Sequence, residues 1–178
     1  ETGNVNSERL KKLINLANSK GLDLKKISTK DKWVYSNRHT IVALCDPKET
    51  YSEKNIDKLN LSNIALLDHI QDTNNVGAIA RSASAFNFNI ICLPKKRSVN
   101  ITERTFSISS GGLENVNVVF YNSIFSLIKK LKSLDYWTIG LEMYAEENIS
   151  NISFNDQKVA LFIGSEESGL SSEVQKKL

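Results

Sequence analysis

The chain contains little cysteine and no long apolar run. Its 178 residues include two cysteines, Cys45 and Cys92, and each lies within a short apolar run typical of a buried strand. We therefore expect two buried free thiols in a reducing compartment rather than a disulfide or a metal pair. No apolar run approaches the roughly 20 residues that a transmembrane helix needs, and no secretory signal pattern heads the chain. These absences predict an intracellular protein.

Common cofactor and metal motifs are also missing. The sequence has no G-x-G-x-x-G, no Walker lysine motif and no metal-ligand spacing. Its two histidines, His39 and His69, lie far apart in strand-like contexts. We expect each to be an ordinary core or edge histidine, and no metal site is predicted.

From residue 63 onward, short apolar runs alternate with helical patterns. The expected order is strand, helix, strand, an irregular or helical segment, strand, helix, strand, a long loop, strand and helix. Such alternation predicts an α/β fold, in which a mostly parallel sheet carries helices on both faces. Ligands of such folds bind outside the carboxyl ends of the strands.

The segment from Leu66 to Asn87 is the first candidate site. An apolar strand over residues 64–67 leads into a polar turn, where Asn75 is suited to cap a helix. Gly77 removes a Cβ from the first helical turn, and Arg81, one turn further, can bring its guanidinium to the same mouth as an anion ligand. The alternative is a capped helix with a small-residue packing face and a solvated arginine.

A second candidate follows the apolar strand at residues 159–163. Gly164 and Gly169 bracket the carboxylates Glu166 and Glu167, and Ser171 can cap a last helix. Taken alone, this segment also fits an ordinary acidic loop.

Together these segments resemble the SpoU, or TrmH-like, family of RNA ribose 2′-O-methyltransferases in the SPOUT superfamily. The first family motif is matched by Asp72, Thr73, Asn75, Gly77 and Arg81, with Thr73 where proline is usual. Two further segments follow in the family order. The middle segment is Ser109–Glu114, and the last consists of Gly164, Glu166, Gly169 and Leu170. The resemblance covers about residue 63 to the end of the chain and implies a knotted sheet.

The resemblance also implies the chemistry. It implies S-adenosylmethionine as the cofactor and a homodimer with active sites near the interface. The expected catalytic residues are Arg81, Asn75 and Glu166, with Glu166 orienting Arg81, and the expected cofactor-binding residues are Leu141, Gly164, Ser165 and Gly169. Because a guanidinium has no acceptor, we expect Arg81 to stabilise the developing alkoxide and the adjacent phosphate, while another group or water removes the proton.

Three functions remain open at this point. The first is methylation of a ribose 2′-hydroxyl, in ribosomal RNA rather than transfer RNA, in the cytoplasm or in an organelle with its own ribosomes. The second is a non-catalytic RNA-binding relative that assists ribosome assembly. The third is an unrelated nucleotide- or metabolite-binding α/β domain, which requires all three motif matches to be coincidental.

The two ends of the chain carry further expectations. Residues 7–20 show helical spacing with Gly21 as a stop, and residues 22–27 and 39–45 resemble strands. We therefore expect residues 1–46 to be part of a small RNA-binding domain, residues 47–61 to be a linker and residues 62–178 to be the methyltransferase domain. The family's third motif would follow Leu178, so the methyltransferase domain is expected to be incomplete.

Basic residues are distributed unevenly over a chain of net charge +3. The cluster after the strand at residues 89–93 is expected to contact RNA phosphates, and it consists of Lys95, Lys96, Arg97 and Arg104. Lys129, Lys130 and Lys132 instead fit the solvated face of a helix. The apolar residues of that helix are expected to pack inward, and they are Ile124, Phe125, Leu127, Ile128 and Leu131.

Overall fold

The computed structural model describes residues 8–27, 41–59, 63–96 and 99–178. The chain divides into two compact units, Glu1–Asp46 and Pro47–Leu178. None of the helices in these described ranges is long and apolar enough to cross a membrane.

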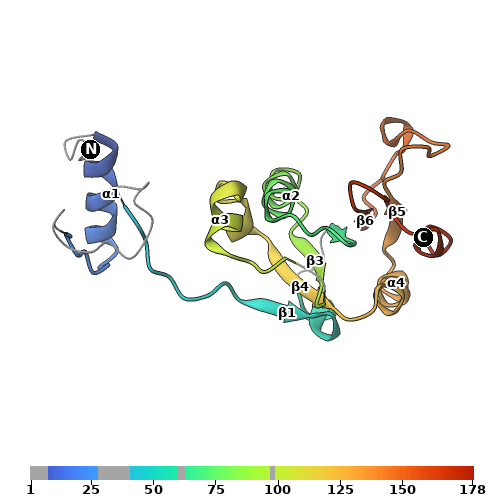
Figure 1. Ribbon diagram of the computed structural model, residues 1–178, viewed down its shortest axis with the longest axis horizontal. Helices are drawn as coiled ribbons and strands as arrows, with labels where there is room; N and C mark the ends of the chain where they lie inside the picture. The colour runs from blue at the N-terminus through green and yellow to red at the C-terminus, as the bar shows by residue number, and fades with distance from the viewer. Residues whose placement is uncertain (1–7, 28–40, 60–62, 97–98) are drawn as a thin grey trace. The chain divides into compact units, whose positions relative to one another are not determined.

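The first unit contains the helix α1 (Glu8–Ser19), which confirms the helical spacing (Figure 1). The helix ends before Gly21, whose φ of +66° allows the chain to leave it. Residues 22–27 and 41–45 form no strand, because no described strand of this unit pairs with them, and residues 39–40 lie outside the described ranges. The expectation of a buried Cys45 is wrong, since its side chain is exposed.

The second unit is built on a six-stranded sheet with the order β1-β4-β3-β2-β6-β5 (Figure 1). Every pair of neighbouring strands is parallel, as the alternating pattern predicts. The strands are β1 (Thr50–Ser52), β2 (Ile64–Leu67), β3 (Ile90–Pro94), β4 (Asn117–Tyr121), β5 (Trp137–Gly140) and β6 (Val159–Ile163). The helices are α2 (Thr73–Ala85), α3 (Glu103–Ser109), α4 (Ile124–Ser133) and α5 (Ser172–Gln175), with 3₁₀ turns η1 (Glu53–Lys58), η2 (Gly112–Asn115) and η3 (Ile149–Asn151).

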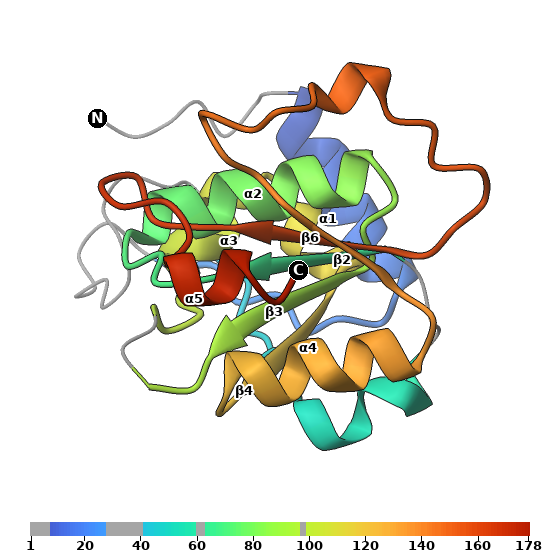
Figure 2. The ribbon, with the colours of Figure 1, turned by 90° about the vertical axis from the view of Figure 1, so that its right-hand side faces the viewer.

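Alternate side chains of the central strands enter two separate cores. Ile64 and Leu66 of β2 pack in a core with α4, α5 and η1, whereas Ala65 and Leu67 pack in a core with α2 and η2. Figure 2 shows α2 and α4 on opposite sides of the strands. Both faces of β2 are therefore buried, which explains why this strand is a continuous apolar run.

Two expectations about packing are wrong. Residues 47–61 are more than a linker, because they contain η1 and the edge strand β1, which pairs with β4. Ile56 of η1 is fully buried in the core. On α4, Phe125 remains 43% exposed, while Leu127, Ile128 and Leu131 are buried as predicted.

The register of the sheet places two motifs next to each other. Leu67 of β2 is paired with Ile163 of β6, and the Asp68 amide donates a hydrogen bond to the Ile163 carbonyl at 2.8 Å. The chain leaves both strands at the same edge. The segments that follow them, which carry the first and last motifs, therefore begin as neighbours.

Candidate functional site

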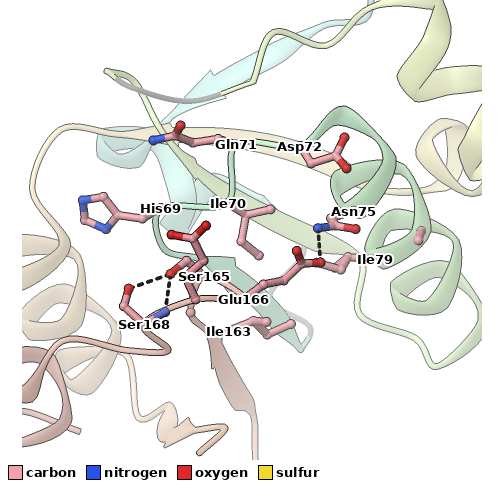
Figure 3. A pocket seen from close by; sticks show the side chains of 13 residues that line it. His69, Ile70, Gln71, Asp72, Asn75, Ile79, Ile163, Ser165, Glu166 and Ser168 are labelled. Atoms are coloured by element: carbon pink, nitrogen blue, oxygen red, sulfur yellow. Dashed lines mark hydrogen bonds between the residues drawn. The ribbon is translucent and has the colours of Figure 1, made fainter.

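A cavity of about 690 Å³ lies at the carboxyl ends of β2 and β6. Three segments line it: residues 69–72 after β2, the first turns of α2, and residues 163–168 at the end of β6 (Figure 3). Its size is within the range of small-molecule and cofactor sites, which is about 300–1,000 Å³. The cavity lies at the edge of the sheet where an α/β fold is expected to bind ligands.

Asp72, rather than Asn75, caps the helix at this cavity. The Asp72 carboxylate accepts a hydrogen bond from the Asn74 amide at 2.8 Å, and α2 already begins at Thr73. The hydrogen bonds from the backbone and then the side chain of Asn74 lower the pKa of Asp72. The prediction of Asn75 as the N-cap is wrong because the N-cap is Asp72, three residues earlier. The side chain of Asn75 is therefore available for another contact.

That contact joins the two sequence motifs. Asn75 Nδ2 donates a hydrogen bond to Glu166 Oε1 at 2.5 Å, across the cavity wall between α2 and the loop after β6 (Figure 3). The structure thus brings two of the three expected catalytic residues together. The contact also corrects the expected role of Glu166, whose carboxylate pairs with Asn75 rather than with Arg81.

Arg81 lies away from this pair. Six residues correspond to about 600° of helical rotation, so Arg81 projects from a different side of α2 than Asn75. Its side chain is exposed and is not part of the cavity wall. Its backbone packs against η2, where a Cβ on Gly112 would lie 2.6 Å from the Arg81 Cα. The expectation that Gly77 and Arg81 share the cavity mouth is therefore wrong.

The loop after β6 is held by close backbone packing. A Cβ at Gly164 would lie only 2.1 Å from the carbonyl carbon of Gly169, so position 164 has no room for a side chain. The loop is closed by a hydrogen bond from the Gly169 amide to the Ser165 carbonyl, and the Ser165 and Ser168 hydroxyls lie 2.7 Å apart. Of the expected cofactor residues, Gly164 and Ser165 line the cavity, whereas Gly169 and Leu141 do not.

Glu142 supports this loop, although the sequence does not identify it as a site residue. Its carboxylate accepts hydrogen bonds from the Leu170 amide at 3.2 Å and from Gln175 Nε2 at 2.7 Å. It follows Leu141, whose amide donates to the Phe162 carbonyl. The position of Glu142 just after β5 is the only sequence signal for this role.

The expected RNA-binding residues are separated into two groups. Lys95 and Lys96 are exposed directly after β3. Arg104 comes from α3 and donates from Nη2 to Asn74 Oδ1 at 3.1 Å, which places it at the start of α2. Arg97 lies outside the described residues.

A buried acid and a histidine follow β2 at the cavity. Asp68 is 3% exposed, and its Oδ1 lies 2.8 Å from His69 Nδ1. The hydroxyl of Tyr121 lies 3.1 Å from the Leu67 carbonyl and 3.4 Å from Asp68 Oδ1, and burial, followed by the Asp68 charge, raises the pKa of Tyr121. His69 is among the residues that line the cavity, and its exposed side chain paired with Asp68 fits the expected edge histidine rather than a core one. The adjacent Asp-His pair at a strand end is the sequence signal that could have identified it.

The described residues form no candidate metal site. Within the described ranges, no three His, Cys, Asp or Glu side chains gather in an arrangement that could hold a metal ion.

Comparisons with known proteins show the family of the chain. A family model described as the SpoU rRNA Methylase family matches residues 62–178. A Staphylococcus aureus (strain MSSA476) protein assigned to the TrmH family of tRNA/rRNA methyltransferases is 33% identical over 121 residues, which is 68% of this chain and 48% of that protein. YacO of Bacillus subtilis (strain 168) is assigned to the same family. It is 28% identical over 176 residues, which cover 93% of this chain and 69% of YacO. The chain thus spans about half the length of the S. aureus relative.

Solved structures share the fold at lower sequence identity. An rRNA methyltransferase from Sinorhizobium meliloti superposes with a TM-score of 0.64 at 18% identity, over 73% of this chain and 50% of that chain. The SpoU methyltransferase AviRb from Streptomyces viridochromogenes was solved in complex with AdoMet. It superposes with a TM-score of 0.58 at 20% identity, over 65% of this chain and 45% of that chain. The fold class predicted from the sequence is confirmed. Because the family model matches more than half of its length, the chain belongs to the SpoU rRNA methylase family.

Proposed function

We propose that this chain carries the catalytic domain of an RNA methyltransferase that uses S-adenosylmethionine and methylates a ribose 2′-hydroxyl. The observation that carries the proposal is the hydrogen bond between Asn75 and Glu166, which joins the two family motifs across one cavity. Family membership and the AdoMet-bound relatives supply the reaction class and the cofactor.

The cavity suits the cofactor in size and in charge. Its volume of about 690 Å³ is sufficient for a nucleoside-sized ligand. Its wall carries the carboxylates Asp72, Glu166 and Glu167, whose negative charge favours a sulfonium cation. Gly164 and Ser165 form the wall at the end of β6, the Gly169 amide closes the loop by a hydrogen bond to the Ser165 carbonyl, and the Leu141 amide donates to the Phe162 carbonyl of β6. When bound, S-adenosylmethionine supplies an activated methyl group.

The residues of this chain hold the cavity wall in place and bind the negative charge of the RNA. Asn75 and Glu166 fix the cavity wall on the side of α2. Arg81 is exposed on the same helix outside the cavity wall, where its guanidinium binds an RNA phosphate. Lys95, Lys96, Arg97 and Arg104 contact further phosphates, which makes RNA binding depend on salt.

We further propose ribosomal RNA as the substrate, homodimerisation, and RNA binding by residues 1–46. The family description names rRNA, whereas the curated relatives are assigned to both tRNA and rRNA. The described part of the first unit supports RNA binding by its charge. Residues 8–27 carry two acidic residues, Glu8 and Asp23, against the basic residues Arg9, Lys11, Lys12, Lys20, Lys25 and Lys26.

The test is methyl transfer from tritiated S-adenosylmethionine to RNA transcribed in vitro. Unmodified large-subunit ribosomal RNA is expected to accept label, and a pool of unmodified tRNA transcripts is expected to accept less. Alkali-resistant dinucleotides in the product identify a ribose 2′-O-methyl group. Label in a base would overturn the ribose assignment, and preferential labelling of tRNA would overturn the substrate. Cofactor-independent RNA binding without transfer would support a non-catalytic role in ribosome assembly.

A further inference from the structure

The carboxylate of Glu142 joins three elements of the sheet unit. Glu142 follows β5, and its Oε1 accepts hydrogen bonds from the Leu170 amide at 3.2 Å and from Gln175 Nε2 at 2.7 Å. Gln175 is the last residue of α5, and its Nε2 also donates to the Leu170 carbonyl at 2.9 Å. The two side chains therefore bind both backbone groups of Leu170. We call this set of hydrogen bonds among Glu142, Leu170 and Gln175 the Glu142 clasp.

Gly169 leaves room for this carboxylate. A Cβ at position 169 would lie 3.1 Å from Glu142 Oε1, which is closer than ordinary van der Waals contact. The φ of Gly169 is +61°, in the left-handed region that favours glycine. The Glu142 carboxylate therefore lies directly against the backbone at Gly169, and the glycine serves both the turn and the close approach.

Short backbone contacts connect the Glu142 clasp to the cavity wall. The Gly169 amide donates to the Ser165 carbonyl at 2.9 Å, and Gly164 packs against Gly169 so closely that no side chain fits. Gly164 and Ser165 line the cavity, as does Glu166. Because Leu170 is the next residue after Gly169, fixing its backbone also fixes the residues that form this wall.

The loop of residues 164–170 thus has two anchors. Glu166, near its start, accepts from Asn75 of α2, whereas Leu170, at its end, is held by Glu142 after β5. Leu141, which directly precedes Glu142, donates its amide to the Phe162 carbonyl of β6. The clasp therefore fixes the end of the loop relative to β5, and the contact with Asn75 does not replace it.

We propose that Glu142 is a positioning residue of the methyl-transfer site, and this inference rests on the proposed function. Glu142 holds the loop of residues 164–170 in the conformation that binds S-adenosylmethionine. It does not line the cavity, so it acts through the loop and not on the cofactor itself. A loop that is ordered before the ligand arrives loses less conformational entropy on binding, which increases affinity.

Amide exchange in the protein without cofactor or RNA is the first measurement. Glu142→Ala removes the acceptor of the clasp, whereas Glu142→Gln keeps a carbonyl oxygen that can accept both hydrogen bonds. The Leu170 amide should exchange about tenfold faster or more in Glu142→Ala than in the wild type. Glu142→Gln should restore most of the protection.

Calorimetry with S-adenosylmethionine is the second measurement. The Kd should rise about tenfold in Glu142→Ala and stay within about threefold of the wild-type value in Glu142→Gln. A variant that was merely less stable would contain fewer folded molecules, which would lower the binding stoichiometry and leave the Kd of the folded fraction unchanged. The Kd and its rescue by Glu142→Gln therefore separate positioning from stability.

Two further variants complete the test. Gln175→Met removes one donor of the Glu142 clasp at an exposed position, so it should raise the Kd about threefold and speed the exchange of the Leu170 amide. Glu146→Ala is the matched control, because Glu146 is an exposed glutamate in the same loop outside the clasp. It should leave the Kd and the exchange rate as they are in the wild type.

The outcomes distinguish this inference from the proposed function. A folded Glu142→Ala whose Kd stays within about twofold of the wild-type value would overturn the positioning role alone. If Glu142→Ala does not fold, an unchanged Kd in Gln175→Met would overturn it instead. A wild type that binds S-adenosylmethionine but methylates neither rRNA nor tRNA would overturn the proposed function and leave the role of Glu142 in cofactor binding standing. A wild type that does not bind S-adenosylmethionine would overturn both.

Discussion

Asn75 and Glu166 are 91 positions apart in the sequence, and their hydrogen bond is the direct link between α2 and the loop after β6. A hydrogen bond to a charged group contributes about 1.5–3 kcal/mol, and the lower value applies at this exposed position. We therefore predict that Glu166→Ala weakens S-adenosylmethionine binding about tenfold in calorimetry. The physical reason is that the loop loses its anchor on α2.

A double-mutant cycle isolates this contact. Asn75→Ala should weaken cofactor binding to a similar extent, and the double variant should be little worse than either single variant because both remove the same hydrogen bond. Glu147→Gln, in the exposed loop before β6, is the control and should bind as the wild type does. Fully additive losses would show that the two side chains act independently.

Gly164 permits a backbone approach that no other residue allows. An added Cβ would lie 2.1 Å from the Gly169 carbonyl carbon, so Gly164→Ala should destabilise the protein by about 3 kcal/mol or more. Gly111→Ala is the matched control, because Gly111 has a φ of +90° but open space around it, and its cost should be about 1–2 kcal/mol. Urea denaturation measures both changes. Equal losses would mean that backbone conformation, rather than the clash, governs position 164.

The sequence predicts some of these residues better than others. Asn75, Glu166, Gly164 and Ser165 are recognisable because they stand in or beside the first and last family motifs, and the structure places all four on the cavity wall. The absence of Arg81 from this wall is not recognisable in the same way, because it depends on where α2 begins and on which side of the helix faces the cavity.

At the scale of elements, the start of α2 depends on the Asp72 cap. Asp72→Ala should lower Tm by about 3–5 °C, whereas Asp72→Asn should have little effect because asparagine caps equally well. The hydrogen bonds from Asn74 lower the pKa of Asp72 below 3.8. The stabilisation is therefore present at neutral pH and is lost as the pH falls through this lowered pKa. Thermal melts from pH 7 to pH 2 should show the gap between wild type and Asp72→Ala closing at the acid end. A gap that persists at pH 2 would contradict the capping role.

The clearest of the correctly predicted strands are β2 and β6, which lie inside the sheet. Residues 64–67 and 159–163 are continuous apolar runs because helices cover both sides of the sheet. The edge strand β1 was not predicted, because Thr50–Ser52 is short and mostly exposed. Conversely, alternation at residues 22–27 suggests a strand, but a strand needs a neighbour to pair with, and sequence alternation does not supply one.

The burial of Ile56 makes the segment before β2 part of the sheet unit. Ile56→Ala should cost about 2–5 kcal/mol, because it removes a fully buried side chain from the core beside α4. Asn55→Ala, at the exposed neighbouring position of η1, should change stability by less than about 0.5 kcal/mol. The measurement is the free energy of unfolding in urea. A loss below about 1 kcal/mol for Ile56→Ala would restore the interpretation of residues 47–61 as a linker.

At the scale of the whole molecule, the two units are expected to divide RNA binding and chemistry between them. The residues that line the cavity and those of the two hydrophobic cores all belong to the unit Pro47–Leu178. The helix α1 of the first unit has no buried residue. Removing residues 1–46 should therefore leave the Tm of the sheet unit within about 2 °C and its cofactor affinity unchanged. The basic residues of the first unit would be lost, so affinity for the ribosomal RNA transcript should fall about tenfold or more at low salt, with a smaller loss at high salt. Titration of labelled transcript at several salt concentrations measures this effect. An unchanged affinity would show that residues 1–46 do not bind RNA, whereas a lower cofactor affinity would show that they contribute to the catalytic unit.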